Sequence, residues 1–89
     1  MNRYTVVIDD KAERQLRAVQ DKKLLRNLRG RILALGENPR PAGVKKLVGV
    51  ADKWRIRVGD WRVIYVIEDG RLVVLVVAVG LRGEVYGRM

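Results

Sequence analysis

The segment KWRIRVGDWRVIYVIEDGRLVVLVVAV, residues 53–79, decides the fold of this 89-residue chain. It contains three apolar runs whose length and spacing are typical of β-strands. The runs span residues 53–58, 61–68 and 71–79. Gly59-Asp60 and Asp69-Gly70 separate them, and two-residue pairs of this kind form hairpin turns. The segment therefore predicts an antiparallel meander of three strands, and a short fourth strand is expected near Glu84 to Tyr86.

The turn at Gly59-Asp60 fixes which residues of the first hairpin lie opposite each other. A two-residue turn pairs Val58 with Trp61, and Arg57 with Arg62 one position further along the ladder. Because side chains alternate along a strand, each face of the hairpin has its own composition. The apolar face consists of Trp54, Ile56, Val58, Trp61, Val63 and Tyr65. The opposite face gathers Arg55, Arg57 and Arg62.

Two arginines directly across a sheet repel each other, so the pair Arg57 and Arg62 needs an explanation. Acidic groups elsewhere in the protein could neutralise them, or an anion could bind between them. The nearby acids Asp52 and Asp60 lie in turns and not on this face. This favours phosphate binding, because guanidinium groups pair well with phosphate oxygens.

The second turn brings later residues to the same place. If Asp69-Gly70 is a two-residue turn, it pairs Glu68 with Arg71 and Arg62 with Val77. The third strand then ends beside the Gly59-Asp60 turn, and the segment GLRGEVY leaves the sheet there.

Arg82 and Tyr86 would thus join Arg57 and Arg62 at one end of the sheet. Tyr86 could be a core tyrosine, or its ring could stack on an unpaired base. Convergence of cations from separate segments with an aromatic ring indicates a nucleic-acid site.

The N-terminal half predicts a strand followed by a helical hairpin. Apolar periodicity indicates a strand over 3–8 and helices over 11–20 and 22–35. Asp9 or Asp10 can cap the first helix and Asp21 the second. Residues 38–52, which include both prolines and two glycines, predict a loop that contains Lys45 and Lys46. The whole chain, 1–89, is expected to form a single α+β domain: an N-terminal strand, an antiparallel helix hairpin, then an antiparallel three- to four-stranded meander, with the helices packed on one side of the sheet.

The outer face of the second helix is basic. Its cations are Lys22, Lys23, Arg26, Arg29 and Arg31. A solvated surface is the simplest interpretation, and a secondary role in gripping RNA is the alternative.

Charge and composition narrow the function further. The chain has 19 Lys and Arg against 10 Asp and Glu, for a net charge of +9, which favours a polyanionic partner over a merely solvated basic surface. It has no cysteine and no histidine, so disulfides and thiol catalysis are excluded, and neither a metal nor a cofactor is expected. The N-terminus turns acidic too early for a secretory signal, and no apolar run approaches membrane-spanning length, so a cytoplasmic location is expected.

The stretch KKLVGVADKWRIRVGDWRVIYVIEDGRLVVLVVAVGLRGEVY, residues 45–86, resembles the RelE toxins of the RelE/ParE superfamily of type II toxin–antitoxin systems. The hairpin and the closing G-x-R-x-x-V-Y pattern carry the resemblance, which extends over nearly the whole chain. It implies a RelE-like fold and a metal-independent endoribonuclease that cuts mRNA in the ribosomal A site. The RNA's own 2′-hydroxyl would be the nucleophile. A cognate acidic antitoxin, encoded by a neighbouring gene, would form a hetero-oligomer with the toxin.

The resemblance also implies site residues. The catalytic set would be Arg55, Arg57, Arg62, Arg82 and Tyr86. Further RNA contacts would come from Lys45 and Lys46, together with Arg55 and Arg62. Some family members carry lysine at the positions of Arg55 and Arg57, and arginine is a poor general base because its pKa is too high. Two alternatives remain: a ParE-like gyrase inhibitor that cuts no RNA, and a non-catalytic nucleic-acid-binding module.

Overall fold

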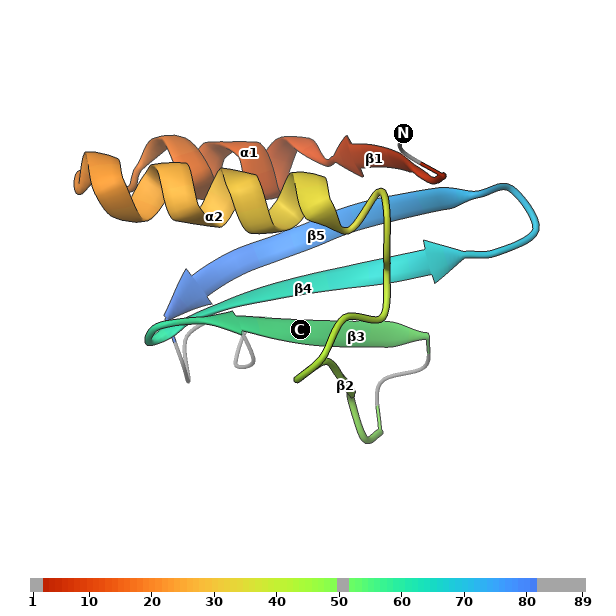
Figure 1. The fold of residues 1–89 in the computed structure, drawn as a ribbon. Coiled ribbons are helices and arrows are strands. Elements are labelled where there is room, and N and C mark those ends of the chain that lie inside the picture. The colour runs from red at the N-terminus through yellow and green to blue at the C-terminus, as the bar shows by residue number, and fades with distance from the viewer. Residues whose placement is uncertain (1–2, 50–51, 82–89) are drawn as a thin grey trace.

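The computed structural model describes residues 3–49 and 52–81 of the chain (Figure 1). Its elements, in order, are β1 (Thr5–Ile8), α1 (Asp10–Arg17), α2 (Lys22–Ala34), β2 (Lys45–Lys46), β3 (Lys53–Val58), β4 (Trp61–Glu68) and β5 (Val73–Leu81). Figure 1 shows the two helices side by side along one face of the sheet. The predicted α+β arrangement, with both helices on one side, is confirmed.

Both helices begin at the aspartates that the sequence indicates. Asp9 caps α1 by accepting a hydrogen bond from the Ala12 amide at 2.8 Å. Asp21 caps α2 and accepts from two amides of its first turn, at 3.0 and 3.1 Å. Each cap satisfies backbone donors that have no partner within the helix, which fixes where the helix starts.

An ion pair joins the two helices. Arg29 of α2 donates two hydrogen bonds to the Glu13 carboxylate of α1, at 2.8 and 3.2 Å. Arg17 donates to the same carboxylate at 3.0 Å. These contacts, with Arg29 the stronger, lower the pKa of Glu13 to about 2. The helix hairpin is therefore held by a charge pair as well as by its apolar stripe.

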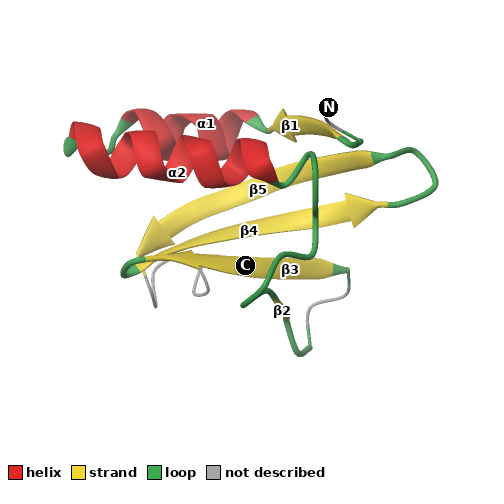
Figure 2. Cartoon of the chain, in the orientation of Figure 1, coloured by secondary structure: helices red, strands yellow, loops and turns green. Residues whose placement is uncertain are grey.

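The sheet is mixed and has five strands in the order β1-β5-β4-β3-β2 among the described residues. β1 pairs with β5 in parallel, with Thr5 opposite Val73, and the other strand pairs are antiparallel. The sequence predicts only a loop at Lys45 and Lys46, and this is wrong because the two residues form a two-residue edge strand on β3. Figure 2 labels this segment beside β3, on the far side of β3 from the helices. The expected strand near Glu84 to Tyr86 falls outside the described residues.

The hairpin of β3 and β4 has the predicted register. Val58 lies opposite Trp61 and Arg57 opposite Arg62. Gly59 occupies the first turn position with φ of +62°, a conformation that a residue with a Cβ adopts only with strain. The alternation that the sequence predicts for this hairpin is therefore retained in the structure.

The predicted register of β4 and β5 is wrong. Glu68 lies opposite Val73 and not Arg71, and Arg62 lies opposite Gly80 and not Val77. The turn is longer than two residues, since the Arg71 amide donates to the Glu68 carbonyl at 3.2 Å and β5 starts only at Val73. A register shift between Ile64 and Tyr65 moves the pairing further.

Apolar packing fills the space between the helices and the sheet. The fully buried residues there come from both helices and from β3, β4 and β5. The largest of them are Tyr65, Leu16, Leu28, Ile32, Leu35 and Ile56. A second, smaller cluster of Ile64 and Ala78, with Leu47 and Val77 against it, belongs to the other side of the sheet. That side is therefore partly apolar, which the sequence does not predict.

Candidate nucleic-acid interface

Four cations share the side of the sheet that faces away from the helices, and we call this surface the basic face. Its residues are Lys45, Arg55, Arg57 and Arg62. Strand pairing places them in two rows: Lys45 of β2 lies opposite Arg55 of β3, and Arg57 of β3 lies opposite Arg62 of β4. Directly paired residues of antiparallel strands project to the same side of the sheet. The two pairs are therefore neighbours on one face, because Arg55 and Arg57 are two residues apart on β3.

Arg55 is the most unusual of these cations. Its exposed fraction is only 9%. Its Nε and Nη1 atoms are buried, and neither has a hydrogen-bond partner among the described residues. A buried charge without a partner is costly, and native proteins rarely retain one. An anion that accepts from Nε and one Nη of a guanidinium would satisfy both atoms at once, as phosphates do.

Arg62 lies in the other row and has an exposed fraction of 5%. Its Nη1 donates to the Trp61 carbonyl at 3.2 Å. Its partner on β5 is Gly80, which adds no side chain above it. Arg57 is exposed. In the described part of the chain no carboxylate forms an ion pair with Arg55, Arg57 or Arg62.

The structure separates the two lysines that were predicted to bind RNA. Lys45 joins the basic face beside Arg55. Lys46 lies opposite Trp54, and its Nζ is 5.8 Å from the centre of the Trp54 ring, on the helix side of the sheet. The loop contributes one cation to the basic face and uses the other to hold the edge strand against β3.

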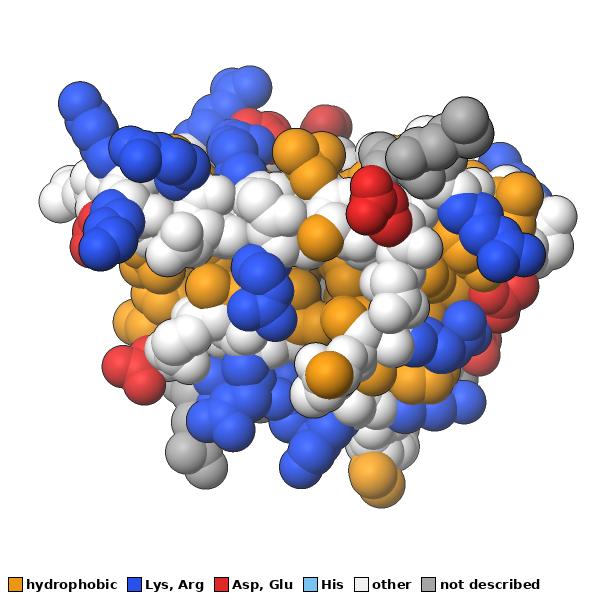
Figure 3. Space-filling view, in the orientation of Figure 1, with side chains coloured by type: hydrophobic (Ala, Val, Ile, Leu, Met, Phe, Trp, Pro, Cys, Tyr) orange, Lys and Arg blue, Asp and Glu red, His pale blue; other side chains and the backbone are white. Residues whose placement is uncertain are grey.

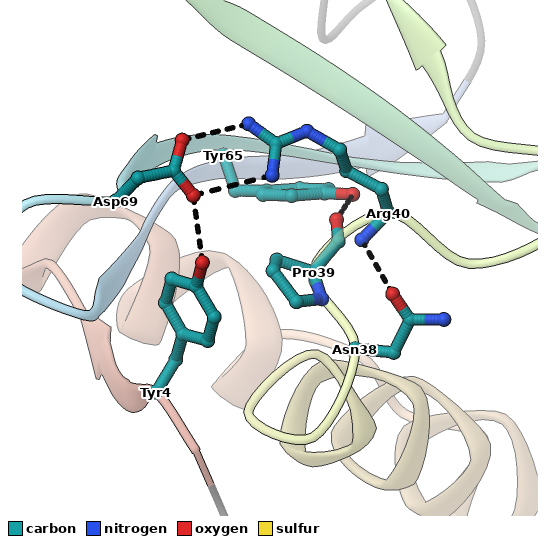
Figure 4. Close-up of polar contacts among 6 residues, drawn as sticks. All are labelled: Tyr4, Asn38, Pro39, Arg40, Tyr65 and Asp69. Atoms are coloured by element: carbon teal, nitrogen blue, oxygen red, sulfur yellow. Dashed lines mark hydrogen bonds and ion pairs between the residues drawn. The ribbon is translucent and has the colours of Figure 1, made fainter.

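A cluster of contacts at the other end of β3 anchors this loop, and we call it the clamp: Tyr4, Arg40, Trp54 and Asp69. Figure 4 shows Tyr4, Arg40 and Asp69 of this cluster. Arg40 donates two hydrogen bonds to Asp69, at 2.9 and 3.2 Å, and its guanidinium lies 5.0 Å from the centre of the Trp54 ring. Tyr4 donates to Asp69 at 2.6 Å. The clamp thereby ties the loop before β2 to β1, to β3 and to the turn between β4 and β5.

A buried hydrogen bond supports the clamp from below. The Tyr65 hydroxyl donates to the Pro39 carbonyl at 2.7 Å, next to Arg40 in sequence. Burial raises the pKa of Tyr65. The Arg40 hydrogen bonds, followed by that of Tyr4, lower the pKa of Asp69 to about 2. Sequence analysis missed Arg40 and Asp69, since nothing local links positions 29 residues apart.

The predicted residues Arg82 and Tyr86 lie outside the described residues. The strand that leads to them ends at Leu81, which lies opposite Trp61 next to the turn between β3 and β4. The Gln15 side chain of α1 accepts a hydrogen bond from the Val79 amide at 2.7 Å and so holds this part of β5. The end of β5 is therefore at the predicted place, although the register that leads there differs.

The surface of the molecule is strongly cationic. Figure 3 shows Lys and Arg side chains above and below an apolar band that runs between the helices and the lower strands, with few acidic groups. Within residues 3–49 and 52–81, no three potential metal-ligating side chains come together. None of the helices in this part of the chain has the length and apolar character needed to cross a membrane.

The arginines of the basic face can bind and polarise an anion. Guanidinium groups around a phosphate stabilise negative charge as it grows on the non-bridging oxygens. They do not accept a proton near neutral pH, so the three arginines supply electrostatics and positioning. The geometry of the basic face suits a phosphodiester.

Solved structures of RelE toxins have the same fold. An arginine double mutant of Escherichia coli RelE in the free state is 27% identical, covers 98% of this chain and 93% of its own, and has a TM-score of 0.77. The RelE–RelB complex of Pyrococcus horikoshii gives 29% identity, coverage of 91% and 97%, and a TM-score of 0.79. The RelBE2 toxin–antitoxin complex of Mycobacterium tuberculosis gives 26% identity, coverage of 89% and 98%, and a TM-score of 0.77.

A family model matches nearly the whole chain, as the solved structures do. No curated protein matches the chain. The family model described as the ParE toxin of type II toxin–antitoxin systems matches residues 6–86. The chain therefore belongs to the ParE toxin family and is a type II toxin of the RelE/ParE superfamily.

Proposed function

We propose that this toxin is a metal-independent endoribonuclease of the RelE type, which cuts mRNA in the ribosomal A site. The single observation that carries the proposal is the buried Arg55, whose Nε and Nη1 have no partner among the described residues, within a face that also holds Lys45, Arg57 and Arg62. A toxin that only docks on another protein would not need a buried cation poised for an anion. The likeness to RelE structures points the same way.

The proposed reaction is an internal transesterification. The 2′-hydroxyl of the RNA loses its proton and attacks the adjacent phosphorus, forming the O2′–P bond. The P–O5′ bond breaks, and the 5′-oxygen takes up a proton. The products are a 2′,3′-cyclic phosphate and a 5′-hydroxyl end, and no metal or other co-reactant is consumed.

In this proposal Arg55 and Arg62 hold the scissile phosphate and stabilise its extra charge in the transition state. Arg57 and Lys45 add longer-range attraction for the RNA. Arg82 would act at the leaving oxygen, and Tyr86 would stack on a base to splay the RNA for in-line attack. The proton acceptor would come from another group, such as one on the ribosome.

The proposal includes a partner. The RelE chains of Pyrococcus horikoshii and Mycobacterium tuberculosis form complexes with antitoxins. A net charge of +9 suits an acidic antitoxin that wraps the toxin and folds on binding. The complex would be a toxin–antitoxin hetero-oligomer.

A translation reaction with purified ribosomes and one defined mRNA tests the activity. Primer extension is expected to show breaks within codons with wild type, ending in 2′,3′-cyclic phosphates. Arg55→Gln and Arg62→Gln should abolish the breaks. Arg71→Gln is the matched control, because it removes one guanidinium that is 75% exposed and lies outside both the basic face and the clamp.

The ParE family match makes gyrase inhibition the second candidate. The purified wild-type toxin is therefore also added to a DNA supercoiling assay with purified gyrase. Intact mRNA together with inhibited supercoiling would contradict the ribonuclease proposal. RNA binding without breaks, in the presence of translating ribosomes, would leave only a binding module.

A further inference from the structure

A second cationic site lies on the helix side of the sheet. A surface cavity of about 400 Å³ opens between α2 and the end of β3, and we call it the helix pocket. It is lined by Arg26, Asn27, Gly30, Arg31 and Val58. Its volume is in the range of cavities that take small molecules or nucleotide-sized groups.

The helix places its polar residues around the pocket by spacing alone. Arg26 and Gly30 are four positions apart, and so are Asn27 and Arg31, so the two pairs form neighbouring rows on one surface of α2. Val58 joins the lining from β3 and is 8% exposed. Among the described residues, two guanidiniums, one amide and one apolar side chain thus line the opening.

Gly30 is the residue that indicates a function. It lies well inside α2, where glycine is the least favourable residue after proline. A mid-helix glycine usually permits close packing, but no atom lies within 4 Å of the position that a Cβ would occupy at Gly30. Packing therefore does not require glycine here. Its effect is to leave the pocket open between Arg26 and Arg31.

Neither arginine of the pocket has an internal partner among the described residues. The ion pairs there use Arg17, Arg29, Arg40 and Arg71, and on α2 only Arg29 takes part. The first turn of α2 contains no acidic residue. Arg26 and Arg31 are thus available to an external anion.

We propose that the helix pocket binds a phosphate group of the RNA strand that the basic face holds. The inference rests on the proposed ribonuclease function. Val58 and Arg57 are consecutive residues that project to opposite sides of β3, at the end of the sheet where the turn at Gly59 lies. RNA that leaves the basic face at this end needs only to pass the turn to reach the pocket.

An acidic peptide is the competing occupant, and the lining argues against it. Peptide segments gain most of their affinity from apolar anchors in desolvated pockets. Among the described residues of the lining, Val58 is the single apolar side chain, whereas the others offer charge, an amide or no side chain. This composition favours a phosphate held by two arginines.

Binding of an unstructured RNA of about 12 nucleotides, against one of about 4, tests the proposal. Arg26→Gln and Arg31→Gln should each weaken binding of the longer RNA about fivefold or more and lower the salt dependence by about 0.7 in log–log slope. The shorter RNA, which fills only the basic face, should lose little. Lys23→Gln is the matched control, since it removes one positive charge from α2 outside the pocket.

Gly30→Gln separates binding from stability. Glutamine is a good helix former, so this variant should raise Tm by about 4 °C. Its side chain fills the pocket, so affinity for the longer RNA should fall as in the arginine variants. Gly30→Ala should raise Tm in the same way while leaving the pocket open and the RNA affinity close to wild type.

Two results would overturn the pocket assignment. One is an affinity for the longer RNA that responds to Gly30→Gln and Arg31→Gln no more than to Lys23→Gln. The other is a loss confined to the complex with the antitoxin, which would make the pocket a peptide site. Both differ from failure of the proposed function itself, in which Arg55→Gln would leave RNA binding and cleavage unchanged.

Discussion

Arg40 and Arg55 are two guanidiniums that the structure treats in opposite ways. Arg40 has a side chain 41% exposed, yet it makes two hydrogen bonds to Asp69 and lies over the Trp54 ring. Arg55 is 9% exposed, yet its Nε and Nη1 have no partner in the part of the chain that the structure describes. Proteins normally pair the buried charge and leave the exposed one to water. The reversal separates a cation that stabilises the fold from the cation that we propose binds an RNA phosphate.

The largest expected effect comes from replacing the buried cation. Arg55→Met should reduce mRNA cleavage on translating ribosomes by about 100- to 1000-fold, because it removes a guanidinium from the transition state. Its Tm should equal or exceed that of wild type, because an apolar side chain replaces an unpaired buried charge. Primer extension and thermal unfolding measure the two properties.

Arg40→Met is the control for this prediction, and the opposite pattern is expected. Cleavage should fall by no more than a few-fold, far less than with Arg55→Met, and Tm should fall because the clamp is broken. If Arg55→Met lowered Tm and Arg40→Met lowered cleavage, the division between the two arginines would be reversed.

The support beneath Arg40 should have the next largest effect. Tyr65→Phe removes the hydroxyl that donates to the Pro39 carbonyl and leaves that carbonyl without its partner. The free energy of unfolding, measured in urea, should fall by about 1–2 kcal/mol. Tyr4→Phe, which removes an exposed hydrogen bond to Asp69, should cost less. Equal losses would show that burial does not distinguish the two tyrosines.

A smaller effect should link the clamp to the basic face. Arg40 and Lys46 both contact Trp54, and Lys45, the neighbour of Lys46, lies opposite Arg55. Arg40→Gln should therefore weaken RNA binding a few-fold by loosening β2, and only while Lys45 is present. In a double-mutant cycle it should have no further effect on a Lys45→Gln background. Additive losses would assign Arg40 a contact of its own with RNA.

The smallest effect is on the response to acid. The pKa of Asp69 is lowered from 3.8 to about 2 by Arg40 first and Tyr4 second, so the folded state favours the charged carboxylate. Its contribution is fully present above about pH 4 and is lost as the pH falls toward 2. The difference in Tm between wild type and Asp69→Asn should therefore shrink over this interval. A difference that stayed constant would mean that the carboxylate charge does not contribute.

The two hairpins show what local sequence determines. The β3–β4 register follows from one glycine, because Gly59 at φ of +62° makes a two-residue turn that admits a single pairing. The same reasoning fails at Asp69-Gly70. There the Asp69 side chain is held by Arg40 and Tyr4, and the turn extends to Leu72, which has φ of +54°. Both partners come from distant segments, so the dipeptide does not reveal them.

The candidate site divides in a similar way. Alternation within one hairpin is enough to place Arg55, Arg57 and Arg62 on a common face. It does not reveal that Lys45 and Lys46 separate, because a two-residue edge strand has too few positions to show a period. Nor does helical periodicity mark the helix pocket, since the open space at Gly30 depends on where β3 passes.

The parallel pairing of β1 with β5 has a consequence during synthesis. β1 emerges from the ribosome early, but its ladder partner begins at Val73, near the other end of the chain. Until β5 is synthesised, β1 has no strand to pair with, and its apolar residues Val6 and Ile8 cannot complete their packing. Contacts between residues so far apart in sequence form slowly. The sheet of a nascent chain therefore remains incomplete until β5 has been synthesised, so the folded toxin forms only late in translation.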